Sequence, residues 1–162
     1  MDAATLEKLY REHRQGLFTV ALNITRRAET AEDAIHTAFA RICKRDDLQG
    51  DLTAYIYTAV RNAAIDIHRT RKPAMPIEES FYLPPQNDDQ PHQMMEQFEL
   101  HDAIRKMVDQ LPDDQREIII MKHYTGLTFR QIAQTLGEPL ATVASRYRRT
   151  LDKLKSKLGA AL

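Results

Sequence analysis

The chain has 162 residues, of which 43% are hydrophobic and 28% charged, and its 23 Lys and Arg residues balance its 23 Asp and Glu residues. No apolar run approaches the eighteen or so residues of a membrane span, and the first residues lack the basic and then apolar pattern of a signal peptide. The single cysteine, Cys43, excludes an intrachain disulfide, so we expect a cytoplasmic protein with no membrane insertion.

Residues 1–72 predict three helices. In the first helix, mostly apolar side chains recur every three or four residues, so they should form one stripe that faces the core. This stripe comprises Leu6, Leu9, His13, Leu17, Val20 and Ile24. Thr30 precedes two acidic residues and has the character of an N-cap, so we expect the second helix to run from Thr30 to about Lys44. The polar stretch 45–51 is expected to be a loop. A third helix over 52–71 is apolar over a wide arc, which predicts that it is largely buried.

The composition changes after residue 73. Residues 74–100 contain six acidic residues and no Lys or Arg, and prolines stand at 76, 84, 85 and 91. Such a composition favours a flexible linker over a packed core. We therefore predict an all-α fold with two small helical domains, residues 1–73 and 98–162, joined by a flexible, acidic and Pro-rich linker over 74–97.

Helices are expected to resume near Met94–Phe98 and to continue to about Gln110. A further helix should have Pro112 and the two following aspartates in its first turn, where proline and carboxylates fit. This helix should end before Gly126.

Residues 128–158 predict a helix-turn-helix. Thr128 and Gln131 form a capping box at the start of a short helix, Gly137 closes that helix, and Pro139 turns the chain. The last helix then has an apolar stripe, which consists of Val143, Tyr147, Leu151, Leu154 and Leu158. The second helix of such a motif enters the major groove of DNA.

The last helix gathers positive charge on its other side. Residues 139–158 contain six Lys and Arg residues against one acidic residue, Asp152. A basic amphipathic helix is often only a solvated face, but the short helix, cap and turn before it favour DNA binding. The candidates for contacts with bases and phosphates are Thr142, Ser145, Arg146, Arg148, Arg149 and Lys153.

Two parts of the chain resemble bacterial sigma factors. Residues 111–158 resemble the C-terminal sigma domain, which reads the -35 promoter element. This resemblance is carried by Leu111-Pro112, Gln115-Arg116-Glu117, Gly126-Leu127, Ile132-Ala133, Leu136-Gly137, Thr142-Val143 and Ser145-Arg146. The first half resembles the sigma domain that binds polymerase and opens the -10 element, through the stretches 31-AEDAIHTAF-39 and 55-YIYTAVRNAAIDIHR-69. Two such domains with only a linker between them indicate the extracytoplasmic-function (ECF) subgroup.

The resemblance implies partners and roles. A protein of this kind binds core RNA polymerase and promoter DNA, directs initiation, and needs no cofactor or small-molecule substrate. The candidates for polymerase binding lie on the second helix and are Glu32, Asp33, His36 and Phe39. A mixed acidic and apolar face suits docking on a basic surface, although the carboxylates could instead only complement the helix dipole.

For the -10 element, the resemblance implies that a flipped base enters a pocket of the 45–51 loop. Unpaired bases need stacking surfaces and cationic walls. The candidates for these contacts are Tyr57, Arg61, Asn62, Arg69 and Arg71. Tyr55 is also near the loop, but core packing is at least as good an explanation for that ring.

Three departures from the family pattern bear on function. His36 and Thr37 stand where the family usually has glutamine and an acidic residue. Tyr55 replaces a usual tryptophan, and Ala144 stands where a lysine or another polar residue is common. Thr37 is therefore a candidate phosphorylation site, because a phosphate would supply the missing negative charge at the polymerase face.

The sequence contains no enzyme site: its six histidines lack metal-ligand spacing, and there is no glycine-rich phosphate loop. The leading hypothesis is thus a dissociable initiation subunit of RNA polymerase. The alternative is an autonomous helix-turn-helix regulator, which the linker and the lack of a heptad seam disfavour. A polymerase-binding protein that never touches DNA is disfavoured by the basic helix. The sequence leaves open whether an anti-sigma factor holds the protein inactive, and whether the two domains pack together.

Overall fold

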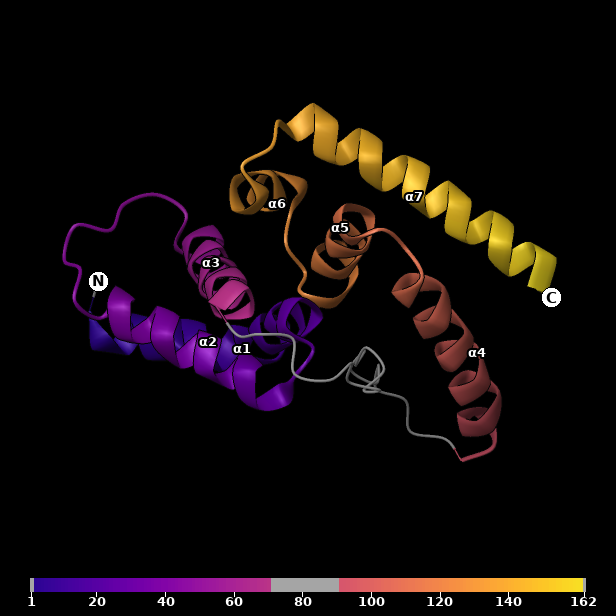
Figure 1. Cartoon of the computed structure of the whole chain (residues 1–162), viewed down its shortest axis with the longest axis horizontal. Coiled ribbons are helices and arrows are strands. Elements are labelled where there is room, and N and C mark those ends of the chain that lie inside the picture. The colour runs from indigo at the N-terminus through magenta and orange to yellow at the C-terminus, as the bar shows by residue number, and fades with distance from the viewer. Residues whose placement is uncertain (1, 71–90, 162) are drawn as a thin grey trace.

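The structure, a computed structural model, describes residues 2–70 and 91–161, and within these ranges it consists of helices and loops without a strand (Figure 1). The side chains of residues 91–98 and 161 lie outside the description. The N-terminal half contains α1 (Ala3–Thr25), α2 (Ala28–Ile42) and α3 (Leu52–Thr70). The C-terminal half contains α4 (Pro91–Asp109), α5 (Asp113–Tyr124), α6 (Phe129–Leu136) and α7 (Leu140–Ala161). The predicted all-α fold is confirmed.

The turn between α1 and α2 is tight. Arg26 adopts a left-handed conformation (φ 61°), and its N–H donates to the carbonyl of Leu22 over 2.8 Å. The chain then reverses at once, so α2 begins at Ala28 with Arg27 as its N-cap. The prediction that Thr30 caps α2 is therefore wrong, and Thr30 is instead a buried residue of the first helical turn. Because α2 begins at Ala28, earlier than predicted, Glu32 lies in its second turn and not in the first.

The N-terminal helices pack around a shared apolar core. Much of α3 is buried, as its wide apolar arc predicts. Each helix turns its apolar stripe inward, and the fully or nearly fully buried residues include Leu17 and Val20 of α1, Ala34 and Ala38 of α2, and Ile56 and Val60 of α3. The predicted loop at 45–51 is confirmed, although α2 ends at Ile42 rather than near Lys44, so the loop begins at residue 43.

The helix-turn-helix is formed by α6 and α7, and its predicted cap is confirmed. The backbone N–H of Gln131 donates to the Thr128 hydroxyl (3.1 Å), while the Gln131 side chain accepts from the Thr128 N–H (2.9 Å). Gly137 ends α6 in the left-handed conformation (φ 66°), which glycine adopts without steric cost. Val143 of α7 is fully buried. Pro112 lies one position before α5, as its N-cap.

The two halves pack directly on each other. Buried apolar side chains of both halves form one continuous core, in which Tyr57 and Val60 of α3 join Leu127 and Ile132 near α6. Figure 1 shows α5 and α6 between the N-terminal helices and α7, with α4 and the end of α7 projecting from the body. The question that the sequence left open is thereby answered: in this structure the two halves are closed together. No helix in the described ranges is long and apolar enough to cross a membrane.

Candidate nucleic-acid and polymerase interfaces

Several basic side chains of α7 are exposed to solvent. Arg148, Arg149 and Lys153 are exposed and form no ion pair with any residue that the structure describes. Thr142 is half-buried and Ser145 exposed, one turn closer to the start of the helix. Figure 1 shows that α7 lies on the side of α5 and α6 opposite to α1, α2 and α3. The cations predicted to contact DNA phosphates are therefore accessible in the closed arrangement.

Helix α7 is anchored through an aromatic cluster. The Tyr147 hydroxyl lies 3.1 Å from Nε2 of His123 on α5, and the Tyr147 ring packs edge-on against Phe129 of α6, with 5.0 Å between centroids. The Lys122 ammonium lies 4.3 Å from the centre of the Phe129 ring, which is a favourable cation–π geometry. Burial, with a smaller contribution from the Lys122 charge, lowers the pKa of His123. The neutral imidazole is thereby favoured, and it can accept a hydrogen bond from Tyr147.

The α3 surface, which contains the candidates for the -10 element, is partly covered by the C-terminal half. The Arg61 guanidinium donates two hydrogen bonds to the Glu117 carboxylate of α5, at 2.5 Å from Nε and 3.3 Å from Nη2. The exposed fractions of these side chains are only 22% and 14%. Asn62 and Arg69 remain exposed, and Arg71 lies outside the described residues. Arg61, a predicted DNA-binding cation, thus forms an ion pair with a carboxylate of the same chain.

Tyr57 is fully buried where α1, α3 and the α5–α6 turn meet. Its hydroxyl lies 3.2 Å from Nδ1 of His13, and burial raises the pKa of the phenol, an effect that a hydrogen bond with Thr125 opposes. Gly16 of α1 lies so close that an added Cβ would overlap the Tyr57 hydroxyl and come within 3.3 Å of the Thr125 Cβ. The Tyr57 side chain is therefore inaccessible to DNA in this arrangement. A contact between Tyr57 and DNA stays a prediction.

The closed arrangement has further polar links, which the sequence reasoning missed. The buried Arg116 of α5 donates from Nε to Asn23 of α1 (2.9 Å), and its other nitrogens bind the Asp113 carboxylate and two carbonyls at the α4–α5 turn. Arg26 binds Asp109 at 2.9 Å, and the Gln131 amide binds Asp51 at 3.1 Å. Arg116 and Glu117 belong to the segment that carries the family resemblance, so the sequence could have marked them as candidates. It could not have identified the residues that they contact.

The predicted polymerase-binding surface on α2 stays uncovered by the C-terminal half. Glu32 and His36 are exposed, Asp33 and Thr37 are half-buried, and α2 packs on α1 and α3 alone among the described helices. Phe39 is half-buried, and its ring packs edge-on against Tyr10 of α1 with 5.3 Å between centroids. The structure thus brings these side chains to one outer surface.

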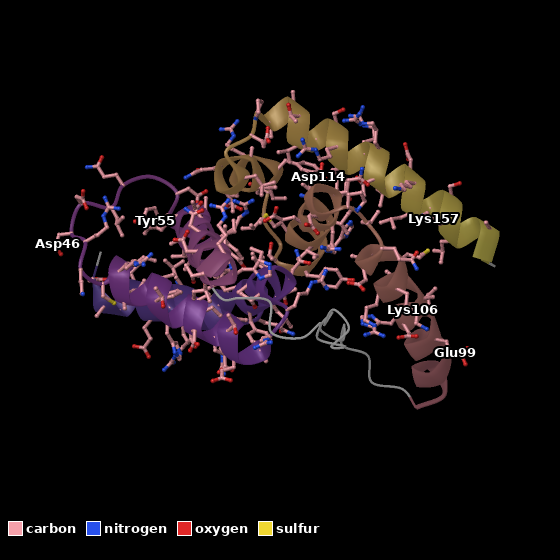
Figure 2. All side chains as sticks on the ribbon, in the orientation of Figure 1. Asp46, Tyr55, Glu99, Lys106, Asp114 and Lys157 are labelled. Atoms are coloured by element: carbon pink, nitrogen blue, oxygen red, sulfur yellow. The ribbon has the colours of Figure 1, made fainter. Side chains whose placement is uncertain are left out.

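The loop between α2 and α3 lies at the edge of the molecule away from α7, where Figure 2 labels Asp46 and Tyr55. Arg45 donates from Nη1 to the Tyr55 hydroxyl (3.0 Å), and its Nε lies 3.4 Å from the Asp47 carboxylate. Tyr55 is half-buried rather than part of the core interior. Among the described residues there is no group of His, Cys, Asp and Glu that could hold a metal ion.

Comparison with known families assigns both halves. Residues 9–73 match sigma-70 region 2, and residues 101–154 match sigma-70 region 4. The chain is 28% identical over 130 residues to the ECF RNA polymerase sigma factor RpoE of Cereibacter sphaeroides, covering 80% of this chain and 71% of that protein. It is 28% identical over 164 residues to SigL of Mycobacterium tuberculosis, another ECF sigma factor, covering 97% of this chain and 90% of SigL.

Two solved structures have the same fold. One is CnrH in complex with the cytosolic domain of CnrY, with a TM-score of 0.66 and 18% identity, covering 98% of this chain and 90% of that chain. The other is the sigma factor RpoE in complex with the anti-sigma factor NepR from Bartonella quintana, with a TM-score of 0.69 and 23% identity. That match covers 94% of this chain and 95% of that chain.

Proposed function

The chain belongs to the ECF group of bacterial sigma factors, and we propose that the structure is its closed resting form, which covers part of its own promoter-binding surface. As a sigma factor it binds core RNA polymerase and directs promoter-specific initiation of transcription. Within that function we assign the α2 surface to polymerase, the α3 surface to the -10 element and the α7 surface to the -35 element.

The observation that carries the proposal is the ion pair between Arg61 and Glu117. A cation on the surface assigned to -10 DNA donates two hydrogen bonds to a carboxylate from the half assigned to the -35 element. Pairing of this kind, with both side chains mostly buried, is strong enough to compete with a phosphate for the same guanidinium. DNA and Glu117 therefore cannot accept hydrogen bonds from Nε and Nη2 of Arg61 at the same time.

Opening is also required by the geometry of promoters. Elements separated by about 17 base pairs lie about 58 Å apart at 3.4 Å per step. The segment between the end of α3 at Thr70 and the start of α4 at Pro91 can span at most about 70 Å when fully extended. In the closed form the two surfaces lie much closer together than this, because Arg61 contacts Glu117 and Arg146 lies 3.6 Å from Asp114 of the same helix, α5. The chain is thus long enough to bind both elements, but only after the halves have separated. Because the α2 surface stays uncovered, polymerase can bind first and then open the closed form.

The proposal is tested by following the distance between the halves while polymerase is added. Cys43 is exposed and is the only cysteine, so one dye can be placed there and a second at Ser156→Cys on the exposed side of α7. We expect high energy transfer in the free protein, low transfer with core polymerase, and run-off transcripts that depend on the factor. Unchanged transfer together with normal transcripts would refute the closed resting form. Tight DNA binding without any transcripts would instead favour an autonomous regulator.

An anti-sigma factor is a further proposed partner. Support comes from the two structures with the same fold, of which one is a complex with an anti-sigma factor and the other a complex with the cytosolic domain of a second protein. A partner that touches both halves would stabilise the closed form by its preferential binding, because a ligand shifts a conformational equilibrium only through differential affinity. In the energy-transfer assay such a partner should prevent the decrease that polymerase causes.

A further inference from the structure

Arg146 differs from the other cations of α7 in its surroundings. Arg148, Arg149 and Lys153 are exposed, whereas only 23% of the Arg146 side chain is exposed. Its Nε lies 3.6 Å from a carboxylate oxygen of Asp114, which belongs to the first turn of α5. Figure 2 shows Asp114 on the part of α5 that faces α7. The arginine predicted to read a base is thus held by an acid from another helix of the same half.

The backbone of Arg146 is fixed on the buried side of α7. The Thr150 hydroxyl, which is nearly fully buried, donates to the Arg146 carbonyl over 2.7 Å, and Val143, one turn earlier, is fully buried. With its backbone fixed and its Nε next to Asp114, the guanidinium has a restricted set of orientations. Arginine side chains otherwise lose rotamer entropy when a ligand immobilises them.

The ion pair leaves part of the guanidinium available. The closest approach to Asp114 is through Nε, and the two terminal nitrogens form no hydrogen bond with any residue that the structure describes. A guanidinium presents its donors in a planar fork, and two of them match the O6 and N7 acceptors of guanine in the major groove. A carboxylate at Nε therefore orients the fork without using the donors that read the base.

From this geometry we propose that Asp114 is a positioning residue for promoter recognition: it holds Arg146 so that its terminal nitrogens select a guanine in the -35 element. The inference rests on the assignment of α7 to that element. Asp114 also carries a cost in general affinity, because its negative charge offsets part of the attraction between Arg146 and phosphates. Its presence thus favours discrimination between sequences over non-specific DNA binding.

The test uses holoenzyme reconstituted from core polymerase and the full chain, with a library of duplexes that are randomised in the -35 window. Arg146→Ala first identifies the base pair that Arg146 reads. Asp114→Asn should then lower discrimination at that same base pair by about five- to tenfold, which is part of the value of a bidentate contact, and leave other positions within about twofold. Binding to duplexes without a promoter should become tighter.

The opposite signs of these two effects separate positioning from a structural role. A residue that only supports the fold of the C-terminal half would weaken discrimination at every position and would not increase non-specific affinity. Asp152→Asn is the matched control, because Asp152 is an exposed acid of α7 and its replacement changes the net charge by the same amount. This control should tighten non-specific binding without loss at the base pair that Arg146 reads.

The double variant Asp114→Asn with Arg146→Ala completes the test. If Asp114 acts through Arg146, the double variant should discriminate as Arg146→Ala does, with no further loss. Additive losses would overturn the proposal, as would unchanged discrimination in Asp114→Asn while Arg146→Ala has lost it. If Arg146→Ala itself changes no position, the assignment of Arg146 to the -35 element fails, and that failure is distinguishable from a failure of the Asp114 proposal alone.

Discussion

The two surfaces assigned to DNA present their cations in opposite ways. On α3, Arg61 is mostly buried against Glu117 of the other half, whereas on α7 the side chains of Arg148 and Arg149 are exposed to solvent. Both surfaces belong to a chain with no net charge, so the difference comes from local packing and not from overall electrostatics. The closed form covers part of the surface assigned to the -10 element and leaves the surface assigned to the -35 element accessible.

The difference between the covered α3 surface and the exposed α7 surface suggests how the closed form would limit initiation before polymerase binds. A duplex-binding helix makes mainly phosphate contacts when alone, and these are weak and non-specific at physiological salt. Exposing it therefore carries little risk of initiation at wrong sites. Under the proposed assignment the α3 surface acts only on opened strands inside the polymerase complex, so covering it until polymerase binds costs no function. Four predictions test whether the covered and exposed surfaces really behave differently.

The largest effect is expected from Glu117→Arg, which replaces the attraction to Arg61 with repulsion. Breaking a mostly buried ion pair costs about 3 kcal/mol, and here the cost falls on the closed form. Energy transfer between dyes on Cys43 and Ser156→Cys should therefore decrease in the free protein. Initiation at limiting amounts of factor should increase, because polymerase no longer has to open the closed form.

The matched control for Glu117→Arg is the charge swap, in which Arg61→Glu is added to it. The swapped pair should restore the closed form and high energy transfer. Initiation by the swapped protein should nevertheless be weak, because the -10 surface would then carry an acid at position 61. A free Glu117→Arg protein as compact as the wild type would show that apolar contacts alone keep the halves together.

The second prediction concerns Tyr57, the buried candidate of α3. Tyr57→Phe removes the hydroxyl that lies 3.2 Å from His13 Nδ1 and leaves the ring. The free energy of unfolding of the closed form should decrease by about 1 kcal/mol, because a part-buried hydrogen bond is lost. Urea unfolding measures this change, and Phe18→Tyr, on a half-buried ring of α1, is a control for the effect of one hydroxyl. If Tyr57 also stacks on an unpaired base, initiation should be retained, because phenylalanine stacks as well.

The sequence predicted the helices and the helix-turn-helix because these depend on local patterns. The capping box of Thr128 and Gln131 and the stop at Gly137 each involve residues within a few positions of one another, and local hydrogen bonds decide them. The start of α2 was missed for a local reason as well. The left-handed Arg26 ends α1 so sharply that α2 can begin without a side-chain cap, and an arginine in that conformation is uncommon.

The contacts between the halves could not be predicted from the sequence. Arg61 and Glu117 are 56 positions apart, and Asn23 and Arg116 are 93 apart. No periodicity relates residues at such separations, and each charge is equally consistent with a solvated surface. The sequence could therefore place candidate residues on α3 and α7, but which of them are covered and which are exposed depends on tertiary packing.

The third prediction addresses the exposed cations of α7. Arg149→Gln should weaken binding of holoenzyme to every duplex by a similar factor, because interactions with phosphates carry no sequence information. The slope of log affinity against log salt should decrease by about one for each phosphate that the variant no longer neutralises. Arg69→Gln on α3, which replaces another exposed arginine, is the comparison. It should leave duplex binding unchanged and reduce only the formation of the open complex. A change of base preference in Arg149→Gln would show that this residue reads a base.

The smallest effect is expected from His123, which anchors α7 through Tyr147. Burial and the nearby Lys122 lower the pKa of His123, so the unfolded chain takes up this proton at higher pH than the folded chain. The contribution of His123 to stability is therefore fully present above its ordinary pKa of about 6.5 and is lost as the pH falls below that value. A single proton can change the free energy of unfolding by at most about 1.4 kcal/mol per pH unit, and His123, whose side chain is exposed, should change it by much less.

The measurement is urea unfolding of the wild type and His123→Gln between about pH 7.5 and pH 5.5, a window around the ordinary histidine pKa. Glutamine can keep a hydrogen bond to the Tyr147 hydroxyl and does not titrate, so the variant should lose less stability on acidification. The other five histidines are present in both proteins, and the difference between the two curves therefore isolates His123. Parallel curves would mean that the α7 anchor does not depend on the neutral imidazole. A wild-type curve that falls more steeply would show that α7, unlike the ion-paired surface of α3, is held in place by a group whose protonation on acidification destabilises the fold.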